Sequence, residues 1–146
     1  MKTSTLRIFS GLALLGFCTT VFINLCSHFS IELSEAAIFI PQVFVIGLAF
    51  PLVKMCNETT PVHNNGNLMH IFSATKGKYL LVLALVVIYG GINFFYFIHL
   101  TKPFPRGEAP LHIQSGIFSS MQMIFAFLEL IIATALIKIT GEKKVT

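Results

Sequence analysis

The residue with the clearest chemical potential in this sequence is Glu129, which lies in the apolar run MIFAFLELIIATALIKI, residues 123–139. A carboxylate inside a lipid bilayer is costly unless it is protonated or paired, and such residues commonly mark ion or proton pathways. The nearest expected cation is Lys54, and Ser10 is the nearest hydroxyl. Two interpretations therefore remain open for Glu129: a proton- or cation-binding group, or a structural group that fixes helix packing.

Four amide side chains form a second polar level: Asn24, Gln42, Asn93 and Gln122. With a rise of about 1.5 Å per residue, they lie roughly 5–10 Å below the outer ends of their segments. Such amides either line a polar cavity or join helices through hydrogen bonds worth about 0.6 kcal/mol each. In the second interpretation, Tyr89 and Tyr96 are the expected partners.

Three histidines are predicted at the outer ends of apolar segments, close to two acidic residues: His28, His99 and His112, with Glu32 and Glu35. Imidazole and carboxylate groups are common metal ligands, and two histidines can bind haem. Their spacing matches no metal or haem motif. The sequence therefore predicts no specific cofactor and leaves a metal or haem site as an alternative.

The segments that must position these residues are apolar and long. The chain of 146 residues is 55% hydrophobic and only 11% charged, whereas soluble domains average about 25% charged residues. Four runs reach the length needed to cross a bilayer, about 20 residues each, and they span approximately 8–27, 36–53, 79–98 and 114–137. We therefore predict a single all-α membrane domain over 1–146, folded as an antiparallel four-helix bundle.

Small and polar residues recur along one face of each predicted helix, and we call such a line a seam. The seam of the last segment comprises Ser115, Ser119, Gln122, Ala126, Glu129 and Ala133. The first has Ser10, Ala13, Phe17, Thr20, Asn24 and Ser27; the second has Glu35, Ile38, Gln42, Val45 and Ala49; the third has Tyr89, Asn93 and Tyr96, beside Gly90 and Gly91. Because membrane helices meet through small and polar residues, Glu129 is predicted to face the other helices.

Basic residues indicate the orientation. Eight lie on one predicted side: Lys2, Arg7, Lys54, Lys76, Lys78, Lys138, Lys143 and Lys144. The other side has only Lys102 and Arg106. The excess predicts that both termini and the loop 55–78 are cytoplasmic, with the loop 99–113 outside. The net charge of +4 is thus explained by topology and contact with anionic lipid, and it does not indicate nucleic-acid binding. Within the inner loop, LMHIFSATKGKY predicts a short interfacial helix.

Motifs of the common enzyme classes are missing from the sequence. The chain has no CxxC pair, nucleotide-binding Walker motif, HExxH or GxSxG pattern, so no enzymatic activity is predicted. Cys18, Cys26 and Cys56 are expected at different depths and predict no disulfide.

The second half of the chain resembles a group of small four-span bacterial membrane proteins. The resemblance lies in LLVLALVVIYGGINFFYF, a Pro/Gly-rich loop and then HIQSGIFSSMQMIFAF. In that group the third span has an aromatic-Ala-x-x-Asn-Phe pattern, and the fourth opens on Phe-Ser-Gly-His-Trp-Met, of which this chain lacks the His and Trp. The resemblance implies a four-span protein of the bacterial cytoplasmic membrane, and it implies no activity, because the group has none established.

Three hypotheses for the function follow, in order of preference. The first is an accessory or assembly subunit that acts through helix contacts with another membrane subunit or with a second copy. The second is a small proton- or cation-coupled transporter or channel that uses Glu129, which requires a cavity that reaches this residue. The third is a metal- or haem-binding membrane protein, which requires that the three outer histidines converge.

Overall fold

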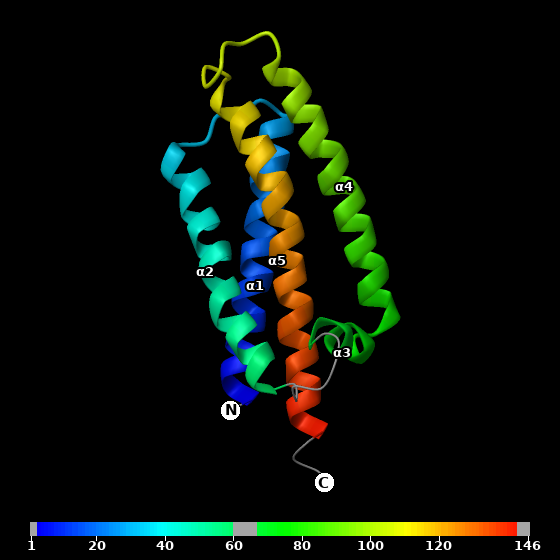
Figure 1. Ribbon diagram of the computed structural model, residues 1–146. Coiled ribbons are helices and arrows are strands. Elements are labelled where there is room, and N and C mark those ends of the chain that lie inside the picture. The colour runs from blue at the N-terminus through cyan, green and yellow to red at the C-terminus, as the bar shows by residue number, and fades with distance from the viewer. Residues whose placement is uncertain (1–2, 60–66, 143–146) are drawn as a thin grey trace.

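The computed structural model describes residues 3–59 and 67–142, and its regular structure is entirely helical (Figure 1). The elements are α1 (Thr3–His28), α2 (Glu35–Thr59), α3 (Asn67–Ala74), α4 (Gly77–Thr101) and α5 (Leu111–Glu142). Of these, α1, α2, α4 and α5 are long and apolar enough to cross a membrane. The predicted all-α chain with four candidate membrane spans is therefore confirmed.

Each long helix extends past the span that hydropathy marks. The second predicted span stops at 53, whereas α2 continues through Pro51 to Thr59. The fourth was expected over 114–137, and α5 occupies Leu111–Glu142. The reason is that apolar counting finds only the hydrocarbon-buried part, while backbone hydrogen bonding continues into the polar interface. Much of the expected inner loop 55–78 is consequently helical, and it contains α3, which confirms the short helix predicted there.

Helix α5 is the centre of the fold and contacts every other helix. Near one end, Ser115 lies beside Ser27 of α1, and near the other end Leu136 lies in one cluster with Leu6. This order of contacts means that α5 runs opposite to α1. Figure 1 shows α2 and α4 on opposite sides of the α1–α5 pair.

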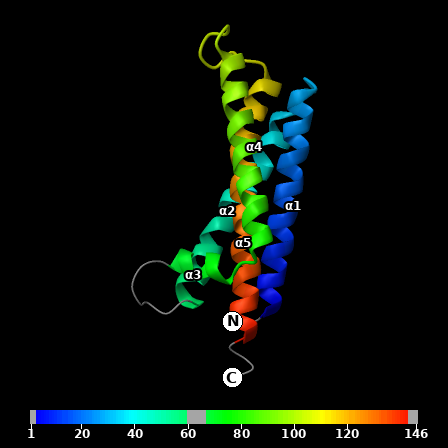
Figure 2. The same cartoon turned by 90° about the vertical axis from the view of Figure 1, so that its right-hand side faces the viewer.

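The apolar core lies at the end of the molecule where α1 and α4 begin. Its buried members are Leu6, Leu52, Cys56, Ile71, Ile132, Ala133, Ala135 and Leu136. Ile71 is the contribution of α3, and its side chain is fully buried. Insertion of this one side chain explains how a helix of only eight residues docks at the base of the fold, where Figure 2 shows it projecting sideways.

Helix α4 is the least buried of the four long helices. Only 17% of its most apolar window is buried, against 50% in α5. Its buried residues are Gly90, Asn93 and Phe97, whereas Tyr89 and Tyr96 of the predicted seam remain 44% and 49% exposed. Helix α4 is therefore attached to the rest of the molecule along one narrow stripe.

Candidate functional site

A polar network joins α1, α4 and α5, and Asn24 is at its centre. The Asn24 side chain is only 1% exposed. Its amide Nδ2 donates to Ser119 Oγ at 3.1 Å and to Ser120 Oγ at 3.0 Å. Its Oδ1 accepts from the hydroxyl of Tyr89 at 3.3 Å and from Nδ2 of Asn93 at 3.5 Å. One side chain of α1 thus holds both α4 and α5.

His28 forms the exposed entrance to this network. Its Nε2 lies 3.0 Å from Oδ1 of Asn93, and because an amide oxygen only accepts, Nε2 carries the proton in this bond. The imidazole ring is stacked on Tyr96 with ring centroids 5.6 Å apart, and it is tilted against Phe97 at 4.9 Å. A hydrogen-bonded path therefore leads from His28 through Asn93 to the buried Asn24.

The serine hydroxyl groups of α5 can accept hydrogen bonds from other helices because each donates its own proton within α5. Ser120 Oγ donates to the Gly116 carbonyl at 2.6 Å, and Ser115 Oγ donates to the His112 carbonyl at 3.0 Å. A hydroxyl that donates within its own helix leaves its lone pairs for a neighbouring helix. Ser120 uses them to accept from Asn24. The bonds around Asn24 thus join uncharged amide and hydroxyl groups of different helices, and such bonds hold membrane helices together.

Two glycines allow the helices to approach each other closely at this level. A Cβ at Gly90 would lie 2.8 Å from the backbone oxygen of Ser120, and a Cβ at Gly116 would lie 2.5 Å from the ring of Phe97. Sequence reasoning identified Gly90 but missed Gly116 and Ser120, because it followed only one face of the fourth span. The spacing of Gly116 and Ser120, small-x-x-x-small, is the signal that marks this second contact face.

Glu129 lies apart from the network, deeper along α5. It is 5% exposed, and the neighbours in its seam, Ala126 and Ala133, are fully buried. Ala126 borders Gly16 of α1, while Ala133 packs in the core with residues of α1 and α2. Glu129 therefore faces the other helices, as the seam predicts. Its Oε2 has no hydrogen-bond partner within residues 3–59 and 67–142.

The other intramembrane candidates do not meet Glu129. Lys54 is exposed on α2, and among the described residues no ion pair joins it to Glu129. Gln42 and Gln122 are buried, at 9% and 8% exposure, yet neither shares a hydrogen bond with Asn24 in the described part of the chain. The predicted amide level is thus divided: Asn24 and Asn93 meet, and the two glutamines stand outside their network.

The outer histidines are not brought together. Among the residues that the structure describes, no three His, Cys, Asp or Glu side chains lie close enough to hold a metal ion. His28 is engaged with Asn93, His99 is exposed, and His112 has a buried Nδ1 with no hydrogen-bond partner in the described ranges.

Two of the pockets formed by the described residues lie at the margins of the helix assembly. One of about 190 Å³ is an apolar hollow between α1 and α2, lined by residues that include Gly16, Thr19 and Pro41. The other, of about 250 Å³, lies between α5 and the α3–α4 junction. Neither is lined by Glu129 or by a member of the Asn24 network.

Comparisons with known proteins give no family for this chain. No family model, curated protein or solved structure matches it.

Proposed function

We propose that this chain is an integral protein of the bacterial cytoplasmic membrane, with four antiparallel spans and both termini in the cytoplasm. The N-terminal ends of α1 and α4 lie on the same side of the molecule as α3 (Figure 1). The described basic residues near this end are Arg7, Lys54, Lys76, Lys78 and Lys138, and those near the other end are Lys102 and Arg106. This unequal distribution supports the proposed orientation.

The orientation is tested by placing single cysteines at two exposed acidic positions, Glu58 and Glu108, with the three native cysteines replaced by alanine. In intact cells, a membrane-impermeant maleimide is expected to label Glu108→Cys. It is expected to label Glu58→Cys only after the cells are permeabilised. Both substitutions remove the same charge, so the pair is internally matched. Labelling of Glu58→Cys in intact cells would contradict the orientation.

We infer that the protein acts through helix contacts, as an accessory or assembly subunit of a membrane complex or of its own dimer. The main support for this function is that α4 contacts the other helices through one narrow stripe of residues. Most of its surface is therefore available to another helix. The exposed part includes Ile88, Phe95 and the half-exposed Tyr96, whose hydroxyl has no hydrogen bond in the described residues. Aromatic side chains with a polar tip are favoured at interfaces between proteins.

The Asn24 network supports this function because it gives α4 a fixed position. Buried amides bonded to other helices act as specific links between membrane helices. Here Asn24 and Tyr89 connect α4 to α1, and Asn24 also connects to Ser119 and Ser120 of α5. A helix that is held by such links presents a defined surface to a partner rather than a variable one.

The contact function predicts where photo-crosslinking occurs in native membranes. A photoreactive residue at Ile88 or Phe95 of α4 is expected to give protein–protein adducts. One at Val43 of α2, which is as exposed as Phe95 at 71%, is expected to give mainly lipid adducts. Mass spectrometry of the adducts then distinguishes a second copy from a partner subunit, since a self-adduct has twice the mass of the chain. Only lipid adducts at all three positions would contradict the proposal.

One observation favours the second candidate function, a proton- or cation-coupled carrier or channel: the Oε2 atom of Glu129 is buried and has no hydrogen-bond partner among the described residues. This candidate makes a contrary prediction for purified protein in liposomes. It requires a proton or cation flux that Glu129→Gln abolishes, whereas the contact function requires no flux in either protein. A flux lost in the variant would replace the assembly proposal with the carrier.

A further inference from the structure

The larger pocket has the composition of an anion-binding site. It has a volume of about 250 Å³ and lies where the end of α3 and the start of α4 meet the last third of α5. Lysines enter it from two elements, Lys76 from the α3–α4 junction and Lys138 from α5, and none of the lining residues that the structure describes is acidic. The pocket thus carries two positive charges that are not neutralised by its own walls.

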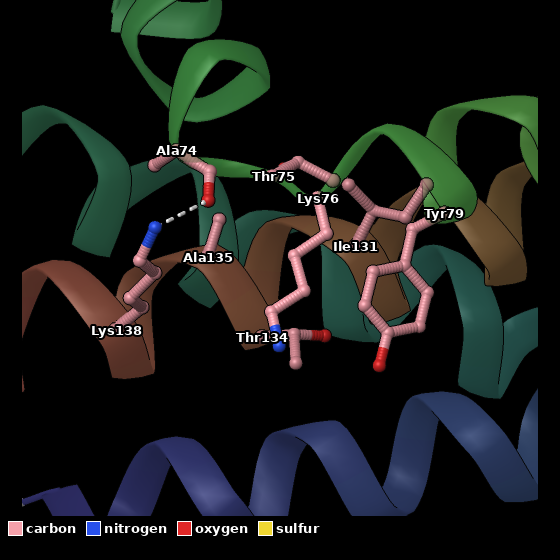
Figure 3. Close-up of a pocket in the computed structure, with 8 residues that line it drawn as sticks. All are labelled: Ala74, Thr75, Lys76, Tyr79, Ile131, Thr134, Ala135 and Lys138. Atoms are coloured by element: carbon pink, nitrogen blue, oxygen red, sulfur yellow. Dashed lines mark hydrogen bonds between the residues drawn. The ribbon is translucent and has the colours of Figure 1, made fainter.

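The polar groups of the pocket retain unused donors. Lys138 Nζ donates to the Ala74 carbonyl at 3.2 Å, which accounts for one of its three N–H groups. Figure 3 shows Lys76 extended across α5 toward Thr134, with the ring of Tyr79 beside it. The Lys76 ammonium and the Tyr79 hydroxyl have no hydrogen bond within the described residues. An incoming oxyanion therefore finds ammonium and hydroxyl donors on two sides.

The pocket also has an apolar wall that continues into the membrane. Ile131 and Ala135 of α5 line it. On α4, one to two turns from Tyr79, Val82 and Leu85 are 41% and 58% exposed. Lysine and tyrosine side chains typically mark the headgroup level of a bilayer. Because charged groups at that level lie next to exposed apolar side chains, the expected ligand is an amphiphile with a charged head and an apolar tail, and not a soluble ion.

We propose that this pocket binds the phosphate headgroup of an anionic phospholipid, with an acyl chain lying along the apolar side of α4. Basic pockets at the ends of membrane helices recognise such headgroups through lysine–phosphate contacts. The binding itself is independent of the assembly function. The orientation proposed above places the pocket in the cytoplasmic leaflet, and only this placement depends on that orientation.

The test is native mass spectrometry of the purified protein in detergent, titrated with phosphatidylglycerol or with phosphatidylethanolamine of the same acyl chains. Each basic residue contributes roughly fivefold to affinity for anionic lipid. The double variant Lys76→Gln/Lys138→Gln should therefore bind phosphatidylglycerol about 25-fold more weakly. The matched control is Arg7→Gln/Lys54→Gln, which removes the same charge from exposed positions at the same end. The control should bind almost as the wild type does.

A variant that keeps the charges tests the pocket itself. Thr134 is exposed and lines the pocket, so Thr134→Trp should fill it without disturbing the core and should also weaken phosphatidylglycerol binding. Unchanged binding in Thr134→Trp, or equal loss in the two double variants, would overturn the proposal. Inorganic phosphate is the competitor that identifies a soluble anion. If it displaces phosphatidylglycerol at equal concentration, the lipid assignment is wrong.

Discussion

Replacing Gly90 by alanine is expected to destabilise the protein by about 1–3 kcal/mol, the range for inserting a methyl group into a packed interface. The added Cβ would lie 2.8 Å from the backbone oxygen of Ser120 and 2.9 Å from the side chain of Ile124. The side chain can rotate away, but the backbone oxygen cannot move without moving α5. Helix α4 must therefore shift outward, which also stretches the bonds of Asn24 to Tyr89 and Asn93.

Gly91 is the matched control, because it is the next residue on the same helix. A Cβ at Gly91 would meet nothing within 4 Å. Alanine is favoured over glycine within a helix by up to about 1 kcal/mol, so Gly91→Ala should be neutral or stabilising. Thermal unfolding in detergent should give the order Gly91→Ala, wild type, Gly90→Ala, from highest to lowest midpoint. Equal midpoints for the two variants would mean that α4 does not pack on α5 through Gly90.

The seams show what a single sequence can predict for a membrane fold. Most of the small and polar residues at 3–4 spacing in three helices are buried, including Thr20, Asn24, Val45 and Glu129. Glu35, the first member of the seam in α2, is exposed instead. The spacing is informative because the lipid-facing surface excludes polar groups and close contact requires small ones. Both constraints act on one helix at a time, so periodicity reveals them without knowledge of the neighbours.

The third span was the exception, because its contact depends on shape. Phe97 is only 1% exposed, and its ring occupies the space above Gly116. A large apolar ring such as that of Phe97 leaves no small or polar signal in its own segment, and the small-x-x-x-small pair of Gly116 and Ser120 on the other helix does not say which side chain fills the space. Tyr89 and Tyr96 look polar in the sequence, yet a tyrosine can bury one edge and expose the other, and both do so here.

The depth of a residue in the membrane says less about which residues it meets than does the direction in which it points from its helix. Gln42 and Asn93 were expected at one depth, but α2 and α4 lie on opposite sides of the α1–α5 pair (Figure 1). Similarly, the seam of α2 continues through Leu52 and Cys56, both buried. Lys54 is two residues from each and so points to the other side of the helix, at about 100° per residue. Direction thus explains why it does not reach Glu129.

Replacing Asn24 by leucine is expected to cost up to about 2.4 kcal/mol of stability, because four hydrogen bonds at about 0.6 kcal/mol each are lost. Leucine has the branched outline of asparagine without its donors and acceptors and is not smaller, so the substitution removes the bonds without leaving a cavity. The substitution also leaves Asn93 without one of its two hydrogen-bond partners inside the protein. Denaturation of the purified protein by sodium dodecyl sulfate gives the free energy of unfolding to compare.

Gln42→Leu is the control that separates hydrogen bonding from polarity. Gln42 is a buried amide at a similar depth, but it makes no hydrogen bond within the described residues, so its replacement should change the free energy of unfolding by less than about 0.6 kcal/mol. Tyr89→Phe adds a second check, since it removes one bond of 3.3 Å and should cost about 0.6 kcal/mol in the wild type and nothing in Asn24→Leu. Equal costs for Asn24→Leu and Gln42→Leu would show that α4 is held by packing at Gly90 and Gly116 alone. A larger cost for Asn24→Leu, coupled to Tyr89, assigns the position of α4 to the network that begins at His28.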